Sequence, residues 1–160
     1  MLHALCDRLS KIQNSKFEIQ HSKLCCDTVP ISDKHWAARA GLGWIGRHTL
    51  FVTKQWGSWV NLAEIVTPEE CSGYDSDKIS IFNFQFSFCQ SCGRCVEACP
   101  NGALKPLASA NSQFCIDVRR CTAYYTTHHS RPLPPDMDTH GYTQGCDLCQ
   151  LACPYNQKQS

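Results

Sequence analysis

The stretch Cys89-Gln-Ser-Cys-Gly-Arg-Cys-Val-Glu-Ala-Cys-Pro100 decides the fold of this chain. Its spacing, Cys-x2-Cys-x2-Cys-x3-Cys-Pro, is that of the bacterial ferredoxin motif, in which three thiolates hold one [4Fe–4S] cluster and the fourth ligates another. The two-residue gaps curl the backbone so that the first three thiolates converge, and the final proline redirects the chain. We therefore expect a module that holds two iron–sulfur clusters.

A second copy of this motif, Cys146-Asp-Leu-Cys-Gln-Leu-Ala-Cys-Pro154, has three of the four cysteines. Thr143 stands where the first cysteine would be, so the missing thiolate has to come from upstream. Cys121 can supply it if the connector folds back, and Cys115 competes for the same role. With Cys121 in that role, the predicted ligands of one cluster are Cys89, Cys92, Cys95 and Cys153, and those of the other are Cys121, Cys146, Cys149 and Cys99.

The cysteine content favours metal binding over disulfides. The chain has 13 cysteines in 160 residues, an odd number, and residues 1–11 lack the basic-then-apolar order of a secretory signal. Structural zinc is the alternative, because Cys-x2-Cys pairs also bind zinc. Zinc has no need of the two Cys-x3-Cys-Pro endings, which favours iron–sulfur clusters.

Charge and hydropathy argue against two other classes of protein. The chain carries 15 basic and 14 acidic residues, for a formal net charge of +1, which gives no support for phosphate-driven nucleic-acid binding. No run approaches the roughly 18 apolar residues that suggest a membrane span. We expect a cytoplasmic protein without a membrane partner.

The residues ahead of the cysteines predict short helices and strands. Asp33 is a candidate N-cap for a helix over residues 34–40, which the run Gly41-Leu-Gly-Trp-Ile-Gly46 would end. Three glycines in that run predict a turn where the backbone approaches something closely. Residues 49–53 and 58–67 are rich in β-branched and aromatic residues, and the four residues between them predict a hairpin connection.

Three upstream stretches carry a resemblance to a known family. They are Cys26-Asp-Thr-Val-Pro-Ile-Ser-Asp-Lys34, Ala37-Ala-Arg-Ala-Gly-Leu-Gly-Trp-Ile-Gly-Arg-His-Thr49 and Gly57-Ser-Trp-Val-Asn-Leu-Ala-Glu-Ile-Val-Thr67. Together with Val118-Arg-Arg-Cys-Thr-Ala-Tyr124 and the second cysteine motif, they resemble the epoxyqueuosine reductase family. These are cobalamin-dependent iron–sulfur enzymes that finish queuosine in tRNA. The similarity runs from about Cys25 to Asn156 and keeps the order of the family's motifs.

The resemblance implies a fold and a reaction. In this α+β chain, residues 1–80 would form part of a cobalamin-binding α/β domain. Residues 81–160 would form a two-[4Fe–4S] bacterial ferredoxin-like domain, and the alternation of apolar and polar residues over 81–88 predicts its first strand. An external electron donor would pass electrons through the two clusters to cobalamin, which reduces epoxyqueuosine in tRNA to queuosine.

The resemblance also implies roles for particular residues. Asp27 matches the aspartate that the family uses as proton donor to the departing oxygen, and a nearby carboxylic acid can protonate an alkoxide. Burial beside a corrin would raise the pKa of that carboxyl group. The implied cofactor contacts are Asp27, Gly43, Phe51, Leu62 and Glu64. An ordinary packing role is the alternative for the strand residues.

Two departures from the family leave alternatives open. Family members have a longer N-terminal part, and many carry a C-terminal helical-repeat region that helps to bind tRNA. We therefore expect a truncated, monomeric member. An electron carrier that has lost the cobalamin pocket is the main alternative, and another corrinoid reductase, such as a reductive dehalogenase, is a further one. His48 invites interpretation as a cobalt ligand, but a solvated side chain is the expectation.

Overall fold

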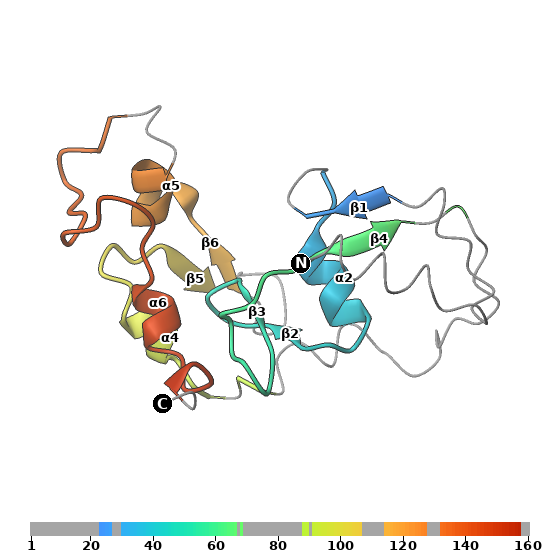
Figure 1. Ribbon diagram of the computed structural model, residues 1–160. Helices are drawn as coiled ribbons and strands as arrows, with labels where there is room; N and C mark the ends of the chain where they lie inside the picture. The colour runs from blue at the N-terminus through green and yellow to red at the C-terminus, as the bar shows by residue number, and fades with distance from the viewer. Residues whose placement is uncertain are drawn as a thin grey trace.

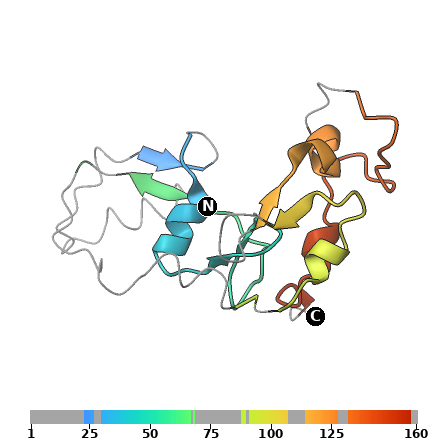
Figure 2. The same ribbon diagram turned by 180° about the vertical axis from the view of Figure 1, so that it is seen from behind.

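The computed structural model describes residues 23–26, 30–66, 68, 88–89, 91–106, 114–127 and 132–157. Its elements gather in two groups, one built from residues 23–66 and the other from residues 91–157 (Figures 1 and 2). Within the described ranges, the strands form antiparallel two-stranded sheets. This mixed α/β architecture agrees with the predicted fold class.

The upstream group begins with a strand pair that is distant in sequence. Strand β1 (Lys23–Cys25) pairs with β4 (Glu64–Val66), so that Lys23 lies opposite Val66. Helix α2 (Asp33–Arg39) lies beside this pair (Figure 1). The pair therefore brings the start of the described chain to the end of the upstream group.

Helix α2 forms where the sequence predicted it, with its start one residue earlier. Ser32 is the N-cap, and Asp33, the predicted cap, occupies the first turn, where a negative charge favours the positive end of the helix dipole. Gly41 follows the C-cap with φ of +73°, a conformation that glycine adopts without the strain of a Cβ atom. The buried face of the helix, Ala37 and Ala38, packs against Phe51.

The glycine-rich run contains a short strand. Strand β2 (Trp44–Ile45) pairs with β3 (Phe51–Val52). A Cβ atom on Gly43 would lie 2.1 Å from the carbonyl oxygen of Val52 and 2.7 Å from Phe51 Cζ. The predicted close approach therefore occurs, and at Gly43 the neighbour is the protein's own strand β3.

The predicted hairpin is correct in its turn and wrong in its strand partners. Thr53 and Gly57 form an antiparallel bridge whose two backbone N–H···O distances are 2.7 and 3.1 Å. Beyond the turn, the backbone N–H of Ser58 donates to Asn156 Oδ1 at 2.7 Å, a partner from the downstream group. The chain does not continue along β3 after this point; β3 pairs with β2, and β4 pairs with β1.

The downstream group has short helices around one strand pair. Strand β5 (Leu104–Pro106) pairs with β6 (Phe114–Ile116). The helices are α4 (Arg94–Glu97), the 3-10 helix η2 (Val118–Arg120), α5 (Thr122–Thr127) and α6 (Leu148–Leu151). Helices α4 and α6 contact each other, and each carries a cysteine of one motif.

Several predictions fall on residues that the structure does not describe. These are residue Asp27 and all of the predicted strand over 81–88 except Phe88. Among the described residues, no helix combines the length and hydropathy needed to cross a membrane.

Candidate metal centre and adjoining cavity

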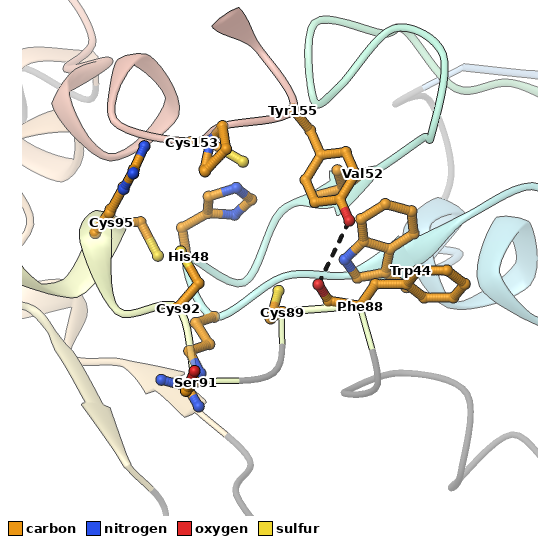
Figure 3. Close-up of a pocket in the computed structure, with 13 residues that line it drawn as sticks. Trp44, His48, Val52, Phe88, Cys89, Ser91, Cys92, Cys95, Cys153 and Tyr155 are labelled. Carbon is orange, nitrogen blue, oxygen red and sulfur yellow. Dashed lines mark hydrogen bonds between the residues drawn. The ribbon is translucent and has the colours of Figure 1, made fainter. Parts of the chain in front are cut away.

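The four cysteines assigned to the first cluster line one cavity. It has a volume of about 460 Å³, and Cys89, Cys92, Cys95 and Cys153 all face it (Figure 3). The backbone N–H of Cys92 donates to the carbonyl oxygen of Cys89 at 2.8 Å, which is the tight turn expected from the two-residue gap. Cys95 lies in α4 and Cys153 follows α6, so the contact between these helices joins the two motifs.

The four cysteines assigned to the second cluster line a smaller cavity of about 40 Å³. They are Cys99, Cys121, Cys146 and Cys149. Cys121 lines this cavity, whereas its competitor Cys115 lies in β6 opposite Lys105. The upstream thiol that the incomplete motif lacks is therefore brought to the others as predicted for Cys121.

Hydrogen bonds next to these cysteines connect the segments that carry the second set of predicted ligands. Asn101 lies two residues after Cys99, and Thr122 directly follows Cys121. The amide N–H of Asn101 donates to Thr122 Oγ1 at 2.9 Å. The hydroxyl of Thr126 donates at 2.8 Å to the carbonyl oxygen of Gly145, the residue directly before Cys146. Buried polar groups of this kind need partners, so the two threonines of α5 fix two other segments, at Asn101 and at Gly145.

The thiolate forms of the buried cysteines are unfavourable without a positive charge nearby. Burial raises the pKa of Cys95 to about 11 and that of Cys149 to about 12, and neighbouring cysteines add to both increases. Burial also raises the pKa of Cys153. Metal binding requires thiolates and releases their protons, so iron would supply the charge that these sites lack.

The arrangement of the thiols around the first cavity fits a cluster better than a single zinc ion. Among the described residues, no three His, Cys, Asp or Glu side chains converge tightly enough to hold one metal ion. The first group instead surrounds an open space. A cubane keeps its four thiolate ligands apart, whereas tetrahedral zinc draws them to about 2.3 Å from one point. The donor sets, four thiols each, suit [4Fe–4S] clusters.

His48 is a buried residue of this site that sequence reasoning missed. Its side chain is 3% exposed and lines both cysteine cavities, so the expectation of a solvated histidine is wrong. Its Nδ1 accepts the backbone N–H of Leu50 at 3.2 Å, and burial lowers its pKa to about 4. A Cβ atom on Gly46 would lie 2.9 Å from the imidazole. That glycine, two residues upstream, was the available signal.

Aromatic rings form one wall of the first cavity. Trp44 stacks on Phe88 with ring centroids 4.5 Å apart and meets Tyr155 edge-on at 4.8 Å. The phenol of Tyr155 donates to the carbonyl oxygen of Phe88 at 3.5 Å (Figure 3). This wall connects β2 to the residue before Cys89 and to the chain after Cys153.

A second, larger cavity of about 770 Å³ is lined by residues of the upstream group and by one residue of the downstream group. Phe51 and Leu62, both predicted cofactor contacts, line it together with the start of α2. Gly43 and Glu64 are not among its lining residues; Gly43 packs against β3, and Glu64 is half-buried in β4. The predicted contact set is thus divided between this cavity and the strands beside it.

The downstream group contributes Gln150 to the wall of that cavity. Gln150 directly follows Cys149 in α6, and its Oε1 accepts the hydroxyl of Ser58 at 2.9 Å. Asn156 donates to Ser58 Oγ at 2.9 Å and to the carbonyl oxygen of Gln150 at 2.7 Å. This polar network fixes a cysteine-bearing helix against the cavity.

Asp27 itself lies outside the described residues, but Cys26 before it and Ile31 after it are described. Cys26 donates its thiol to the carbonyl oxygen of Leu62 at 3.4 Å, and Ile31 lines the larger cavity. Cys26 thus contacts a residue of the cavity wall, and Ile31 is itself part of that wall.

Comparison with known proteins first defines the class of protein. Residues 88–156 match the family described as "4Fe-4S double cluster binding domain". The matched region contains all eight predicted ligand cysteines, and the class is that of iron–sulfur proteins with this domain.

Curated relatives and solved structures then identify the family. The chain is 39% identical to the epoxyqueuosine reductase of Gloeobacter violaceus over 133 residues, 81% of this chain and 37% of the relative. The Synechocystis relative of the same name is 36% identical over 140 residues, 86% of this chain and 44% of the relative. An epoxyqueuosine reductase structure with a modified tRNA-Tyr stem loop aligns with a TM-score of 0.69 at 30% identity, over 99% of this chain and 39% of that one. The chain belongs to the epoxyqueuosine reductase family.

This chain spans about two fifths of the length of these relatives.

Proposed function

We propose that this chain takes part in reducing epoxyqueuosine to queuosine in tRNA, with two [4Fe–4S] clusters and cobalamin as cofactors. The names of the relatives and the tRNA stem loop bound to one structural neighbour support this reaction and this substrate. The double-cluster domain and the two groups of four cysteines support the clusters.

The reaction requires a supply of electrons and protons. Converting the epoxide to an alkene removes one oxygen atom as water and consumes two electrons and two protons. A [4Fe–4S] cluster carries single electrons, so a one-electron donor protein can deliver them in two steps. When bound, cobalamin would supply a cobalt centre that these electrons can reduce.

The observation that carries this proposal is the position of Gln150. It lines the same cavity as Phe51 and Leu62 and directly follows Cys149, a predicted cluster ligand. A cofactor in that cavity would therefore lie against the helix that carries a ligand of the second cluster. An isolated electron carrier has no need of this shared wall.

The residues of the larger cavity fit a corrinoid. Its volume lies within the range of roughly 300–1,000 Å³ that is usual for ligand and cofactor pockets. Phe51, Val60 and Leu62 offer apolar contact area, whereas Ser32 and Lys34 offer polar groups at the start of α2. We assign Phe51 and Leu62 as contacts of the ring, and the polar groups as contacts of its side chains.

Asp27 is the proposed proton donor to the departing oxygen. Ile31, four residues later, lines the larger cavity, and Cys26 contacts Leu62 in its wall, which supports this role. In the Bacillus subtilis epoxyqueuosine reductase, a catalytic loop that carries an aspartate swings out of the active site. A carboxylic acid held beside the substrate can protonate the oxygen as the C–O bond breaks.

An anaerobic iron count combined with a cobalamin titration tests the proposal. After reconstitution we expect about eight irons per chain, four for each cluster, and saturable binding of cobalamin. A stem loop that carries epoxyqueuosine should then be reduced when a low-potential donor is supplied. About eight irons without corrinoid binding would overturn the reductase proposal and support an electron carrier.

A further inference from the structure

Trp44 presents a buried hydrogen-bond donor to the first cysteine cavity. Its side chain is 1% exposed and lines the cavity with the four thiols. Its indole nitrogen, Nε1, has no hydrogen-bond partner among the described residues. Figure 3 shows this nitrogen on the edge of the ring that faces the cavity.

The orientation of the ring is fixed from both sides. Phe88 stacks on one face at 4.5 Å, and Tyr155 packs edge-on at 4.8 Å. On the backbone side, Trp44 is held in β2 opposite Val52, and Gly43 allows the two strands to approach closely. The indole therefore cannot turn to find another acceptor without disrupting this packing.

A buried N–H group without an acceptor is unfavourable, and most such groups in native proteins have a partner. Within this cavity the acceptors that the cysteines would bring are sulfur atoms, either thiolates or the sulfides of a cluster. An N–H···S bond stabilises the more negatively charged, reduced cluster, and such bonds are one of the factors that set cluster potentials. A loaded site would therefore bring a sulfur acceptor to the cavity that the unpartnered donor lines.

We propose that Trp44 is a positioning residue whose indole N–H donates a hydrogen bond to a sulfur atom of the first cluster and raises its reduction potential. This inference rests on the iron–sulfur part of the proposed function and is independent of cobalamin and tRNA. It also gives the tryptophan of the glycine-rich run a role in electron transfer as well as in packing.

Pulsed electron paramagnetic resonance on the reconstituted full chain tests the bond directly. The chain contains four tryptophans, which are labelled with ¹⁵N at the indole nitrogen before anaerobic reduction. Trp44→Phe keeps an aromatic ring between Phe88 and Tyr155 but removes the N–H. Trp56→Phe is the matched control, because Trp56 is 53% exposed and is not among the residues that line the cavity.

We expect a ¹⁵N coupling to a reduced cluster in the wild type and in Trp56→Phe, and its loss in Trp44→Phe. In a redox titration, Trp44→Phe should reduce the ratio of reduced to oxidised first cluster about tenfold at a fixed potential, equivalent to about 59 mV for one electron. The second cluster should keep its midpoint.

Wild-type protein with both clusters and no ¹⁵N coupling would overturn this inference and leave the proposed function standing. Unchanged midpoints in a fully loaded Trp44→Phe would also overturn it. If that variant loses iron, the labelled wild type decides alone, since its coupling does not depend on any substitution. A wild type that binds no clusters would instead overturn the proposed function, and this inference with it.

Discussion

The two groups of elements bury different kinds of side chain. In the upstream group, Trp44 and Val52 are almost fully buried, and Phe51 packs on the alanine face of α2. In the described downstream part, Ala103 and Leu104 are the buried aliphatic residues, and the other buried hydrophobic side chains are those of cysteines. Helices α4 and α6 have four residues each, too few to be stable alone. The upstream group can rely on hydrophobic packing, whereas the downstream group depends on what its thiols bind.

The largest expected effect is the loss of a cluster when one ligand is replaced. Cys92→Ser and Cys149→Ser should each reduce the iron content by about half, because a [4Fe–4S] cluster needs all four of its ligands, and should abolish most reductase activity. Cys115→Ser is the control, because Cys115 does not line the cavity of the second group. Unchanged iron content in both ligand variants would contradict the assignment.

Removing the clusters should unfold one group of elements and spare the other. Metal binding contributes folding energy directly where the site orders the chain. After treatment with a chelator and an oxidant, we expect amide hydrogen exchange to become fast in residues 91–106 and 132–157. Protection should persist in α2, whose buried alanines pack against Phe51 in a cluster that contains no predicted ligand. Equal loss of protection in both groups would show that the upstream core also needs the clusters.

Gly57→Ala should separate the two groups with a moderate loss of stability. Gly57 has φ of +60°, and an added Cβ would lie 1.9 Å from Asn156 Oδ1. Gly102→Ala is a matched control, since Gly102 has φ of +59° and no described heavy atom lies within 4 Å of a Cβ built there.

Both alanine variants carry a similar backbone strain of about 1–2 kcal/mol, and the clash should add about 1–3 kcal/mol to Gly57→Ala alone. Thermal unfolding of the reconstituted protein measures that difference, and cobalamin affinity should fall only in Gly57→Ala. Equal losses of stability in the two variants would mean that the Asn156 contact contributes little.

The smallest expected effect is on the ion pair between β5 and the start of η2. A hydrogen bond from Lys105, 3.1 Å away, lowers the pKa of Asp117 below its usual value of 3.8. Because the folded pKa is the lower one, this contribution is present above about pH 4 and is lost as the pH falls through the folded value. Asp117→Asn keeps an N-cap acceptor and removes the charge. We expect a decrease in Tm of at most about 1 °C at pH 7, since exposed pairs contribute little, and no difference from wild type in strong acid.

The sequence predicts the downstream group of elements, with its local cysteine spacing, better than the upstream group. The grouping of Cys89, Cys92 and Cys95 is local, and the spacing alone indicated it. The partner of β4 could not be found in this way, because β1 lies about forty residues upstream and the contact between Ser58 and Asn156 redirects the chain after the turn. His48 was missed because its polar neighbours Arg47 and Thr49 suggested an exposed position, and the packing of Gly46 against the imidazole is seen only in the folded turn from Gly46 to Leu50.

The network of Ser58, Gln150 and Asn156 has a consequence for the order in which the protein matures. Gln150 completes the wall of the larger cavity only when α6 is in place, and α6 carries Cys149. We therefore expect iron and sulfide to enter before the corrinoid, with apoprotein binding cobalamin weakly until its clusters are assembled. Adding the two cofactors in opposite orders would separate these routes. A cell short of iron would then accumulate a form of this protein that cannot bind cobalamin tightly, even when cobalamin is abundant.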